Sequence, residues 1–268
     1  MTQLSGGIEP APAKINLALH VRARRADGYH ELETLFAFTR FGDRLEAAPA
    51  DDWSLTLTGP TAGDAGPLDD NLVLRAARAF QAEAGGARHA LTLDKRIPVA
   101  AGLGGGSADA GATLRLLNRL AGEPLELAHL ERIGAGLGAD VPACVRSRTA
   151  IGTGVGEALT DTGPLTGMGV LLVNPRVAVP TGPVFRGWDG EDRGALGADW
   201  RSARNDLEGP AIRLQPVIAD VLDWLHGLPG ASLARMSGSG ATCFALFDGP
   251  VPDVTAPQGW WAVGTELL

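Results

Sequence analysis

A glycine-rich run that leads straight into a helix pattern constrains this chain more than any other feature. The run Gly102-Leu103-Gly104-Gly105-Gly106-Ser107 follows a short strand pattern at 90–93. Apolar residues then recur with helical spacing, at Ala112, Leu116, Leu117 and Leu120, before Gly122 ends the pattern. Glycines let a backbone approach an anion closely, and a helix that begins near Ser107 directs its N–H groups at the run. The pattern predicts a phosphate-binding loop, with a mobile linker as the alternative. Ser107 is either the helix cap or a hydroxyl ligand of a phosphate or metal.

The best-known nucleotide motifs are missing. The chain has two lysines, Lys14 and Lys95, and neither follows a glycine, which excludes a P-loop. The dinucleotide fingerprint fails in the glycine run, because its last position is Ser107 when counted from Gly102 and Asp109 when counted from Gly104. The His-Arg-Asp triplet of protein kinases and the Gly-x-Ser-x-Gly of serine hydrolases do not occur either. Any phosphate chemistry must therefore use another arrangement.

Strand and helix patterns follow one another irregularly over 268 residues. The expected strands are 15–21, 34–40, 54–58, 90–93, 170–173 and 243–247. Asn71 is expected to cap a helix that Gly85 and Gly86 end. Further helices are expected after Ser107, after Pro216 and over 125–137. Without regular β-α-β repetition, this order favours an α+β fold over a doubly wound sheet. The character of the sequence changes beyond about residue 155, and 186–200 is expected to be a surface excursion. We therefore expect two domains, 1–155 and 156–268.

Composition restricts the partners and the location. With 23 basic and 31 acidic residues the formal net charge is −8, which disfavours non-specific binding to nucleic acid. No apolar run reaches the ~18–20 residues that a membrane span needs, and the first ten residues do not resemble a secretory signal. Cys144 and Cys243 lie too far apart in the sequence for a zinc knuckle, and two cysteines make no disulfide framework. We expect a reducing, cytoplasmic location and no membrane or nucleic-acid partner.

Two rare residue types mark candidate catalytic positions. Lysine occurs only at Lys14 and Lys95, whereas arginine supplies the other 21 of 23 basic residues. A lysine is a compact charge that arginine does not replace. Asp140, two residues before Pro142, is either a helix cap or a carboxylate that accepts a proton from an attacking hydroxyl. Lys14 would complement such a base by stabilising developing charge, or it is a solvated surface lysine.

Two further segments combine glycine turns with polar side chains. The only tyrosine, Tyr29, precedes His30 beside a tight turn, and such a pair can stack on a nucleobase and bind its edge. The alternative is a half-buried tyrosine and a surface histidine. The cluster 237–240, Ser-Gly-Ser-Gly, precedes a strand and is either a second anion-binding turn or a close backbone crossing.

In combination these segments resemble the GHMP kinases. The three motifs of that family are matched by residues 12–17, 98–108 and 237–242. Four more features resemble the branch of the family that acts on 4-diphosphocytidyl-2-C-methyl-D-erythritol, at residues 26–30, 70–72, 94–98 and 137–142. The resemblance covers nearly the whole chain in the right order. It implies a two-domain α+β fold with the active site in the interdomain cleft. It also implies ATP-dependent phosphorylation of the 2-hydroxyl of that substrate, giving the 2-phosphate and ADP in the non-mevalonate route to isoprenoid precursors.

The resemblance implies roles for individual residues. Lys14 and Asp140 match the catalytic pair, with Asp140 as the general base and Lys14 stabilising charge. Tyr29, His30 and Phe185 match residues that hold the cytosine, and Asn16 and Thr181 match positions that line the substrate cleft. The ATP site is matched by Asn71, Lys95, Pro98, Val99, Ala100, Ala101, Gly102, Leu103, Gly104, Gly105, Gly106, Ser107 and Ala108. Mg²⁺ is expected with ATP, and its only candidate ligand is Ser107, through the phosphates.

Two alternatives to this function stay open. Another GHMP kinase, of the homoserine or mevalonate type, would have no base for Tyr29 and Phe185 to bind. A nucleotide-binding module without catalysis would have no need of both Lys14 and Asp140. One departure from the family pattern is Ala108, which stands where related loops can carry a second serine. The expected partner is a small molecule that carries a cytidine diphosphate, and the sequence does not determine the oligomeric state.

Overall fold

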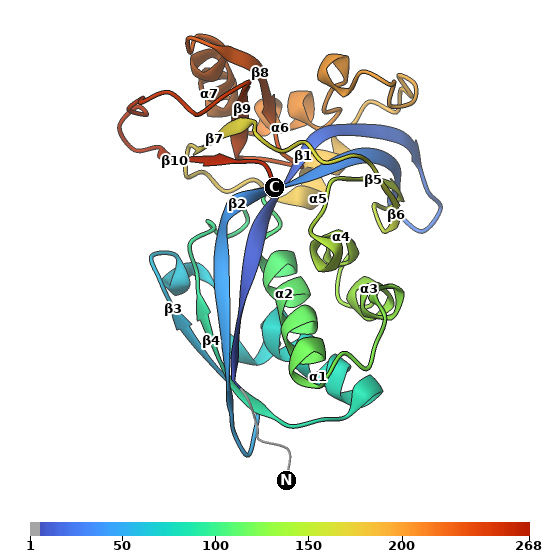
Figure 1. Ribbon diagram of the computed structural model, residues 1–268. Helices are drawn as coiled ribbons and strands as arrows, with labels where there is room; N and C mark the ends of the chain where they lie inside the picture. Colours follow the sequence, from blue (N-terminus) through green and yellow to red (C-terminus); the bar gives the residue numbers. More distant parts are fainter. Residues whose placement is uncertain (1–5) are drawn as a thin grey trace. The chain divides into compact units, whose positions relative to one another are not determined.

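The computed structural model describes residues 6–268, without the side chain of Asp69. It divides into two compact units whose segments interleave along the chain (Figure 1). The first unit holds the described part of Met1–Ala13 with Gly42–Val99 and Gly104–Ser147, and the second holds Lys14–Phe41, Ala100–Leu103 and Arg148–Leu268. Two long strands, β1 (Gly7–Arg24) and β2 (His30–Pro49), contribute residues to both units. The two domains expected from the sequence, with one boundary at residue 155, stay a prediction. In the structure the chain passes from one compact unit to the other after residues 13, 41, 99, 103 and 147.

The first unit packs helices on a small mixed sheet. The later half of β2 pairs antiparallel with β4 (His89–Asp94), which pairs parallel with β3 (Ser54–Thr58). The helices are α1 (Leu72–Ala84), α2 (Gly105–Leu120), α3 (Leu127–Ala135) and α4 (Val141–Arg146), with short 3-10 turns η1 (Ala62–Asp64) and η2 (Leu68–Asp70). Strand β4 buries every second side chain, and Leu91 and Leu93 meet Val73, Phe80 and Leu114 of the helices in one apolar core.

The second unit contains two antiparallel arrangements. The early half of β2 pairs with β5 (Ala150–Gly154), which pairs with β6 (Ala158–Asp161). A separate four-stranded sheet has the order β10 (Trp261–Glu266), β7 (Gly169–Asn174), β9 (Cys243–Phe247), β8 (Ala231–Met236). The helices are α5 (Thr181–Arg186), α6 (Glu208–Leu214) and α7 (Val217–His226), with the 3-10 turn η3 (Trp200–Ser202). All residues of β7 and β9 are buried, and α7 covers one face of this sheet with Ile218, Val221 and Leu225.

The α+β class predicted from the sequence is confirmed, and every expected strand and helix has a counterpart. Four strands, β5, β6, β8 and β10, and two helices, α5 and α6, were not predicted, because they are short and contain glycine, proline or polar residues. A further helix, α4, begins where the 125–137 helix was expected to end in a loop. The long helix begins at Gly105, and not near Ser107, because Gly104 adopts the left-handed conformation (φ 64°) that ends the loop.

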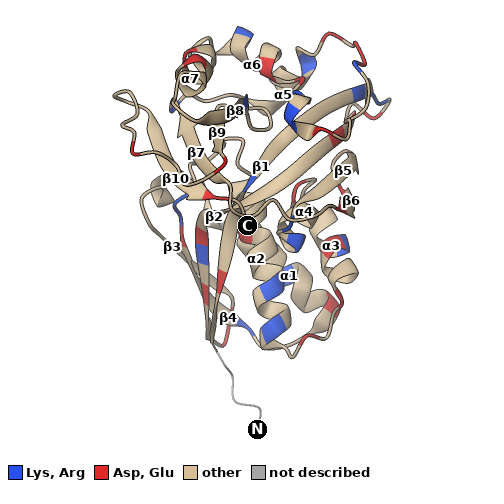
Figure 2. Cartoon of the chain, turned by 45° about the horizontal axis from the view of Figure 1, so that its top comes forward, with Lys and Arg blue, Asp and Glu red and all other residues tan. Residues whose placement is uncertain are grey.

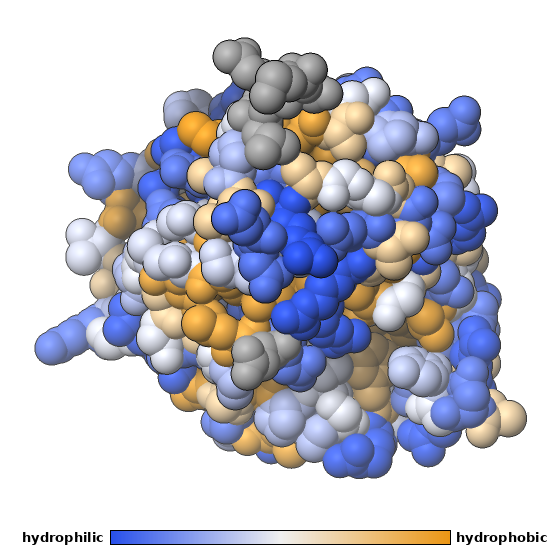
Figure 3. Space-filling model, turned by 90° about the horizontal axis from the view of Figure 1, so that it is seen from below, coloured by the Kyte–Doolittle hydropathy of each residue, from blue (hydrophilic) through white to orange (hydrophobic). Residues whose placement is uncertain are grey.

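The surface carries mixed chemistry. Among the described residues Lys and Arg are interspersed with Asp and Glu, without a basic stripe (Figure 2). On the face shown in Figure 3, hydrophilic residues form a broad band, and hydrophobic residues are interrupted by polar ones. Within residues 6–268, no helix is long and apolar enough to cross a membrane.

Candidate active site

The end of the glycine run in the first unit is shaped by close packing. A Cβ on Gly105 would lie 3.1 Å from Ile97 Cγ2, and one on Gly106 would lie 3.4 Å from Leu72 Cδ1. The N-cap of α2 is Gly104, which has no side chain to occupy the first-turn N–H groups. Ser107 is the third residue of the helix, so its expected role as the cap is wrong. The N-terminal amides of α2 are therefore directed at the loop and suited to an anion.

The tip of the same run, in the second unit, packs against the Ser-Gly-Ser-Gly cluster at 237–240. A Cβ on Gly102 (φ 77°) would lie 2.5 Å from the carbonyl oxygen of Ser237. The hydroxyl of Ser237 donates to the carbonyl oxygen of Gly102 at 2.8 Å, and the N–H of Thr242 donates to that of Ala101 at 3.1 Å. Of the two interpretations of residues 237–240, the close backbone crossing is what the structure contains. Anion binding by this turn stays a prediction.

Lys14 and Asn16 lie beside this crossing on β1 and are both buried. The backbone N–H of Lys14 donates to the carbonyl of Leu103 at 3.0 Å, and its ammonium Nζ donates to Asn16 Oδ1 at 2.9 Å. The same Nζ lies 5.4 Å from the ring centroid of Phe36, within reach of a cation–π interaction. Lys14 is only 3% exposed, so the alternative of a solvated surface lysine is wrong. Its charge is presented from a fixed position.

Asp140, in the first unit, occupies the N-cap position of α4 but does not cap it. Its carbonyl oxygen accepts from the N–H of Cys144 at 3.1 Å, whereas its side chain makes no capping hydrogen bond. The carboxylate is half-buried. The position is thus that of a cap, but the side chain does not act as one. Its role as a base, which is the other interpretation of the sequence, stays a prediction.

Lys95 is buried in an ion cluster in the first unit. Its Nζ donates to Asp109 Oδ2 at 2.7 Å and also to Asp43, and the other oxygen of Asp43 accepts from the N–H of Ile97 at 2.8 Å. Burial lowers the pKa of Lys95, but the carboxylates of Asp109 and Asp43 outweigh this and raise it above its ordinary value. Burial raises the pKa of Asp109. Asp43 and Asp109 were not predicted from the sequence. The one hint in the sequence is Lys95, because a buried lysine needs anionic partners.

The ends of residues 98–104 are tied together by this cluster. Lys95 and Ile97 precede the loop, and Asp109 follows it in the second turn of α2. Asn71, also assigned to the ATP site, caps α1 as predicted, because its Oδ1 accepts from the N–H of Val73 at 2.9 Å.

The residues assigned to the cytosine lie around an aromatic cluster in the second unit. The ring of His30 lies 5.0 Å from that of Phe185 and 5.8 Å from that of Trp188, which meets it edge-on. Tyr29 is 61% exposed and His30 is 7% exposed, the reverse of the half-buried tyrosine and surface histidine considered as the alternative. Burial, and to a smaller extent Arg24, lowers the pKa of His30. The lowered pKa favours the neutral form of the imidazole.

Two polar nitrogens of this cluster are buried without a hydrogen-bond partner among the described residues, His30 Nε2 and Trp188 Nε1. Such atoms require an explanation, since an unpaired buried polar group is unfavourable. Trp188 was not predicted, because it lies in the expected surface excursion 186–200. That expectation is wrong for Trp188, which packs in the core of the unit. Thr181 opens α5 nearby in the sequence, is exposed, and places its hydroxyl 3.1 Å from that of Ser239.

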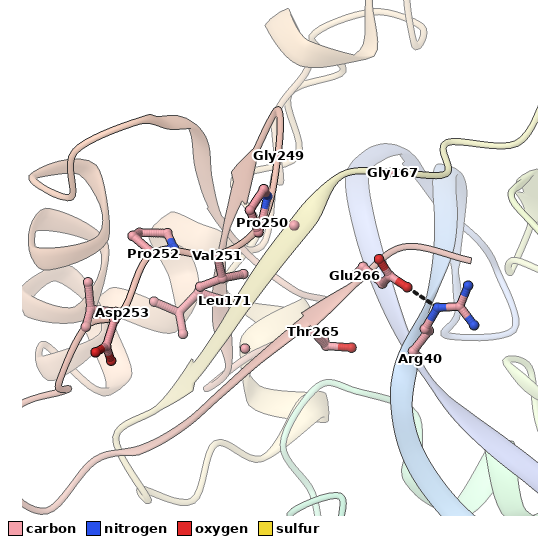
Figure 4. Close-up of a pocket in the computed structure, with 13 residues that line it drawn as sticks. Arg40, Gly167, Leu171, Gly249, Pro250, Val251, Pro252, Asp253, Thr265 and Glu266 are labelled. Carbon is pink, nitrogen blue, oxygen red and sulfur yellow. Dashed lines mark hydrogen bonds and ion pairs between the residues drawn. The ribbon is translucent and has the colours of Figure 1, made fainter.

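A separate hollow of about 730 Å³ in the second unit is lined by none of the predicted residues. Figure 4 shows it beside β7 and β10, with Leu171, Val251 and Asp253 on its walls and an ion pair between Arg40 and Glu266. No group of three or more His, Cys, Asp or Glu side chains that could hold a metal occurs in the described part of the chain.

Comparison with known proteins identifies the family. Residues 71–148 match the GHMP kinases N terminal domain, and residues 191–255 match the GHMP kinases C terminal domain. A 4-diphosphocytidyl-2-C-methyl-D-erythritol kinase of Rhizorhabdus wittichii is 52% identical, over 97% of this chain and 94% of its own length. The enzyme of that name from Novosphingobium aromaticivorans is also 52% identical, over 97% and 92%.

Solved structures agree with this assignment. A crystal structure of 4-(cytidine 5'-diphospho)-2C-methyl-D-erythritol kinase is 35% identical, with a TM-score of 0.79 over 97% of this chain and 99% of that one. A homoserine kinase from Cytophaga hutchinsonii, 17% identical over 93% of this chain and 87% of its own, shares the fold with a TM-score of 0.69. This chain belongs to the GHMP kinases and, within them, to the family of 4-diphosphocytidyl-2-C-methyl-D-erythritol kinases.

Proposed function

We propose that the chain transfers the terminal phosphoryl group of ATP to the 2-hydroxyl of 4-diphosphocytidyl-2-C-methyl-D-erythritol, giving the 2-phosphate and ADP. The observation that carries this substrate is the aromatic cluster. The rings of His30 and Phe185 lie 5.0 Å apart, and two buried nitrogens, on His30 and Trp188, have no hydrogen-bond partner among the described residues. A nucleobase offers such a cluster both a flat ring for stacking and a polar edge for hydrogen bonds. The substrate named for the relatives carries a cytosine.

The phosphates of ATP are proposed to bind at the N-terminus of α2. The amides of its first turn are not capped by a side chain, and the glycines at 104–106 place no side chain of their own beside the backbone. Mg²⁺ is proposed to bind with ATP and would neutralise charge on the phosphates. Ser107, the third residue of α2, is proposed to offer its hydroxyl to the metal or to the phosphates that carry it.

Asp140 is proposed as the general base. Its carboxylate makes no capping bond and would accept the proton of the attacking hydroxyl. Lys14 would stabilise the negative charge that develops during transfer, and its ammonium is already held by Asn16. Asn16 and Thr181 are proposed to line the polyol site.

The aromatic cluster of His30, Phe185 and Trp188 does not support the competing functions. A homoserine or mevalonate kinase binds an acceptor without a base, and the structural likeness to such enzymes, at 17% and 11% identity, shows the fold alone. A nucleotide-binding module without catalysis would not need a buried, oriented Lys14 together with Asp140.

The test measures ADP release from MgATP with four acceptors: the diphosphocytidyl substrate, its polyol without cytidine, mevalonate and homoserine. We expect turnover with the first only, and its loss in the Asp140→Asn variant. Turnover confined to mevalonate or homoserine would mean that the proposed substrate is wrong, although the chain would still be a GHMP kinase. ATP binding without turnover on any acceptor would contradict the proposed reaction.

A further inference from the structure

A short relay of hydrogen bonds leads from Lys14 to a residue that no part of the proposed mechanism uses. Lys14 Nζ donates to Asn16 Oδ1 at 2.9 Å. Asn16 Nδ2 donates to Thr34 Oγ1 at 2.8 Å, and this hydroxyl in turn donates to the carbonyl oxygen of Ala18 at 2.7 Å. Lys14, Asn16 and Thr34 are buried, at 3%, 2% and 1% exposure. Because these three side chains are buried, water does not compete for the hydrogen bonds that join them.

The direction of each bond follows from the chemistry of its two ends. A lysine ammonium only donates and a carbonyl only accepts. Because the single hydrogen of the Thr34 hydroxyl points to Ala18, its oxygen is left to accept from Asn16. The amide nitrogen of Asn16 must then face Thr34, and its oxygen must face Lys14. A flipped amide would place its N–H groups against the ammonium of Lys14 and its oxygen against the Thr34 hydroxyl, whose single hydrogen is already donated to Ala18.

Asn16 has little freedom to find another orientation. Its backbone N–H donates to Ser237 Oγ at 3.1 Å, so the main chain is held by the crossing at 237–240. On the side of Oδ1 the neighbour is Gly238, where a Cβ would lie only 3.2 Å away. Packing thus restrains the position of the amide, but it does not distinguish its oxygen from its nitrogen, which are nearly the same size. The hydrogen bonds make that distinction, because Lys14 can only donate to Oδ1 and the hydroxyl of Thr34 accepts from Nδ2.

We propose that Thr34 is a positioning residue for phosphoryl transfer, because its hydroxyl orients the Asn16 amide and thereby fixes the ammonium of Lys14. This inference rests on the proposed function of Lys14. Thr34 touches neither the lysine nor, in the proposed mechanism, the substrate. Charge stabilisation in a transition state depends on preorganised groups, and a displacement of about 1 Å can reduce the rate on the order of a hundredfold.

The experiment compares Thr34→Val with Thr34→Ser. Valine keeps the shape and removes the hydroxyl, whereas serine keeps the hydroxyl and removes a methyl group. We expect Thr34→Val to lower kcat roughly tenfold or more with KM for both substrates little changed, and Thr34→Ser to restore most of kcat. A structure of Thr34→Val is expected to show Asn16 Oδ1 turned away from Lys14 Nζ.

Thr39→Val is the matched control. Thr39 lies on the same strand, is fully buried, and donates its hydroxyl to the carbonyl of Phe41 at 2.8 Å, outside the relay. We expect it to lose stability but keep kcat. Equal kcat values for Thr34→Val and Thr39→Val would overturn the inference. Inactivity of the unmodified chain on every acceptor would instead defeat the proposed function, so the two failures are distinguishable.

Discussion

Gly111 in α2 lies directly against the backbone of Cys144 in α4. A Cβ at Gly111 would come within 2.6 Å of the carbonyl carbon of Cys144, a distance that no side chain tolerates. The two helices pack closely for this reason. Since α2 begins at the proposed phosphate site and α4 begins directly after Asp140, this contact sets the distance between two parts of the proposed active site in the first unit.

The Gly111→Ala substitution is therefore expected to push α4 away from α2. We predict a loss of about 1–3 kcal/mol in the free energy of unfolding, as for other overpacked cores, together with a reduced kcat. Urea unfolding and steady-state kinetics measure the two effects. Gly209→Ala, in α6, is the control, because the nearest atom to its added Cβ is Nη1 of Arg213, 3.6 Å away at the end of a flexible side chain. Equal stability of the two variants would contradict the role of this contact.

Lys95→Met would leave two carboxylates, Asp43 and Asp109, buried without their lysine. Removing one partner of a buried ion pair costs about 3–5 kcal/mol, and we expect a loss of that order in urea unfolding, with a raised KM for ATP because the loop ends separate. Adding Asp109→Asn to Lys95→Met removes one of the two unpaired buried carboxylates. We expect this double variant to regain part of the stability and part of the ATP affinity. If Lys95 instead binds ATP directly, the double variant will bind ATP no better than the single one.

Asp140→Asn is expected to lower kcat by roughly 10²–10⁴-fold, the usual contribution of a general base. Lys14→Arg is also expected to impair kcat although charge is kept, since a guanidinium does not fit the position held by Asn16. Rate measurements with near-saturating substrates test both, and normal turnover of Asp140→Asn would remove the base from this position.

Phe185→Ala is expected to weaken binding of the cytidine substrate while leaving KM for ATP unchanged. Loss of one base-stacking ring costs about 1–3 kcal/mol, which corresponds to a five- to more than hundredfold increase in the substrate KM. Phe41→Ala provides the comparison, because it removes an aromatic contact, to Trp261, that the cluster does not use. A parallel rise of KM for ATP in Phe185→Ala would mean that the cluster does not select the base.

Acidification is expected to destabilise the fold below the ordinary histidine pKa of 6.5. Burial lowers the pKa of His20, and burial followed by Arg24 lowers that of His30. The unfolded chain then binds more protons than the native chain as pH falls below 6.5, so this contribution to stability is complete above that pH and decreases beneath it. Urea unfolding at several pH values measures the slope. His30→Asn should flatten it.

Local patterns predicted the elements that carry the site. Asn71 caps α1, Gly85 ends it and Gly122 follows α2, as expected, because caps and glycine stops depend on residues a few positions apart. The glycine run and its helix were predicted for the same reason. The start of α2 was placed two residues late, since the left-handed conformation of Gly104 cannot be distinguished in a run of glycines.

The α+β class, the motifs of the family and the residue types available for its chemistry follow from the sequence alone. Which of these side chains are buried, and what they bond to, depends on the tertiary structure. Lys95 finds Asp43 at a separation of 52 residues, and Asn16 finds Thr34 at 18 and Ser237 at 221. Such pairs depend on strand pairing and on the burial of polar groups that must be satisfied. No local periodicity encodes them.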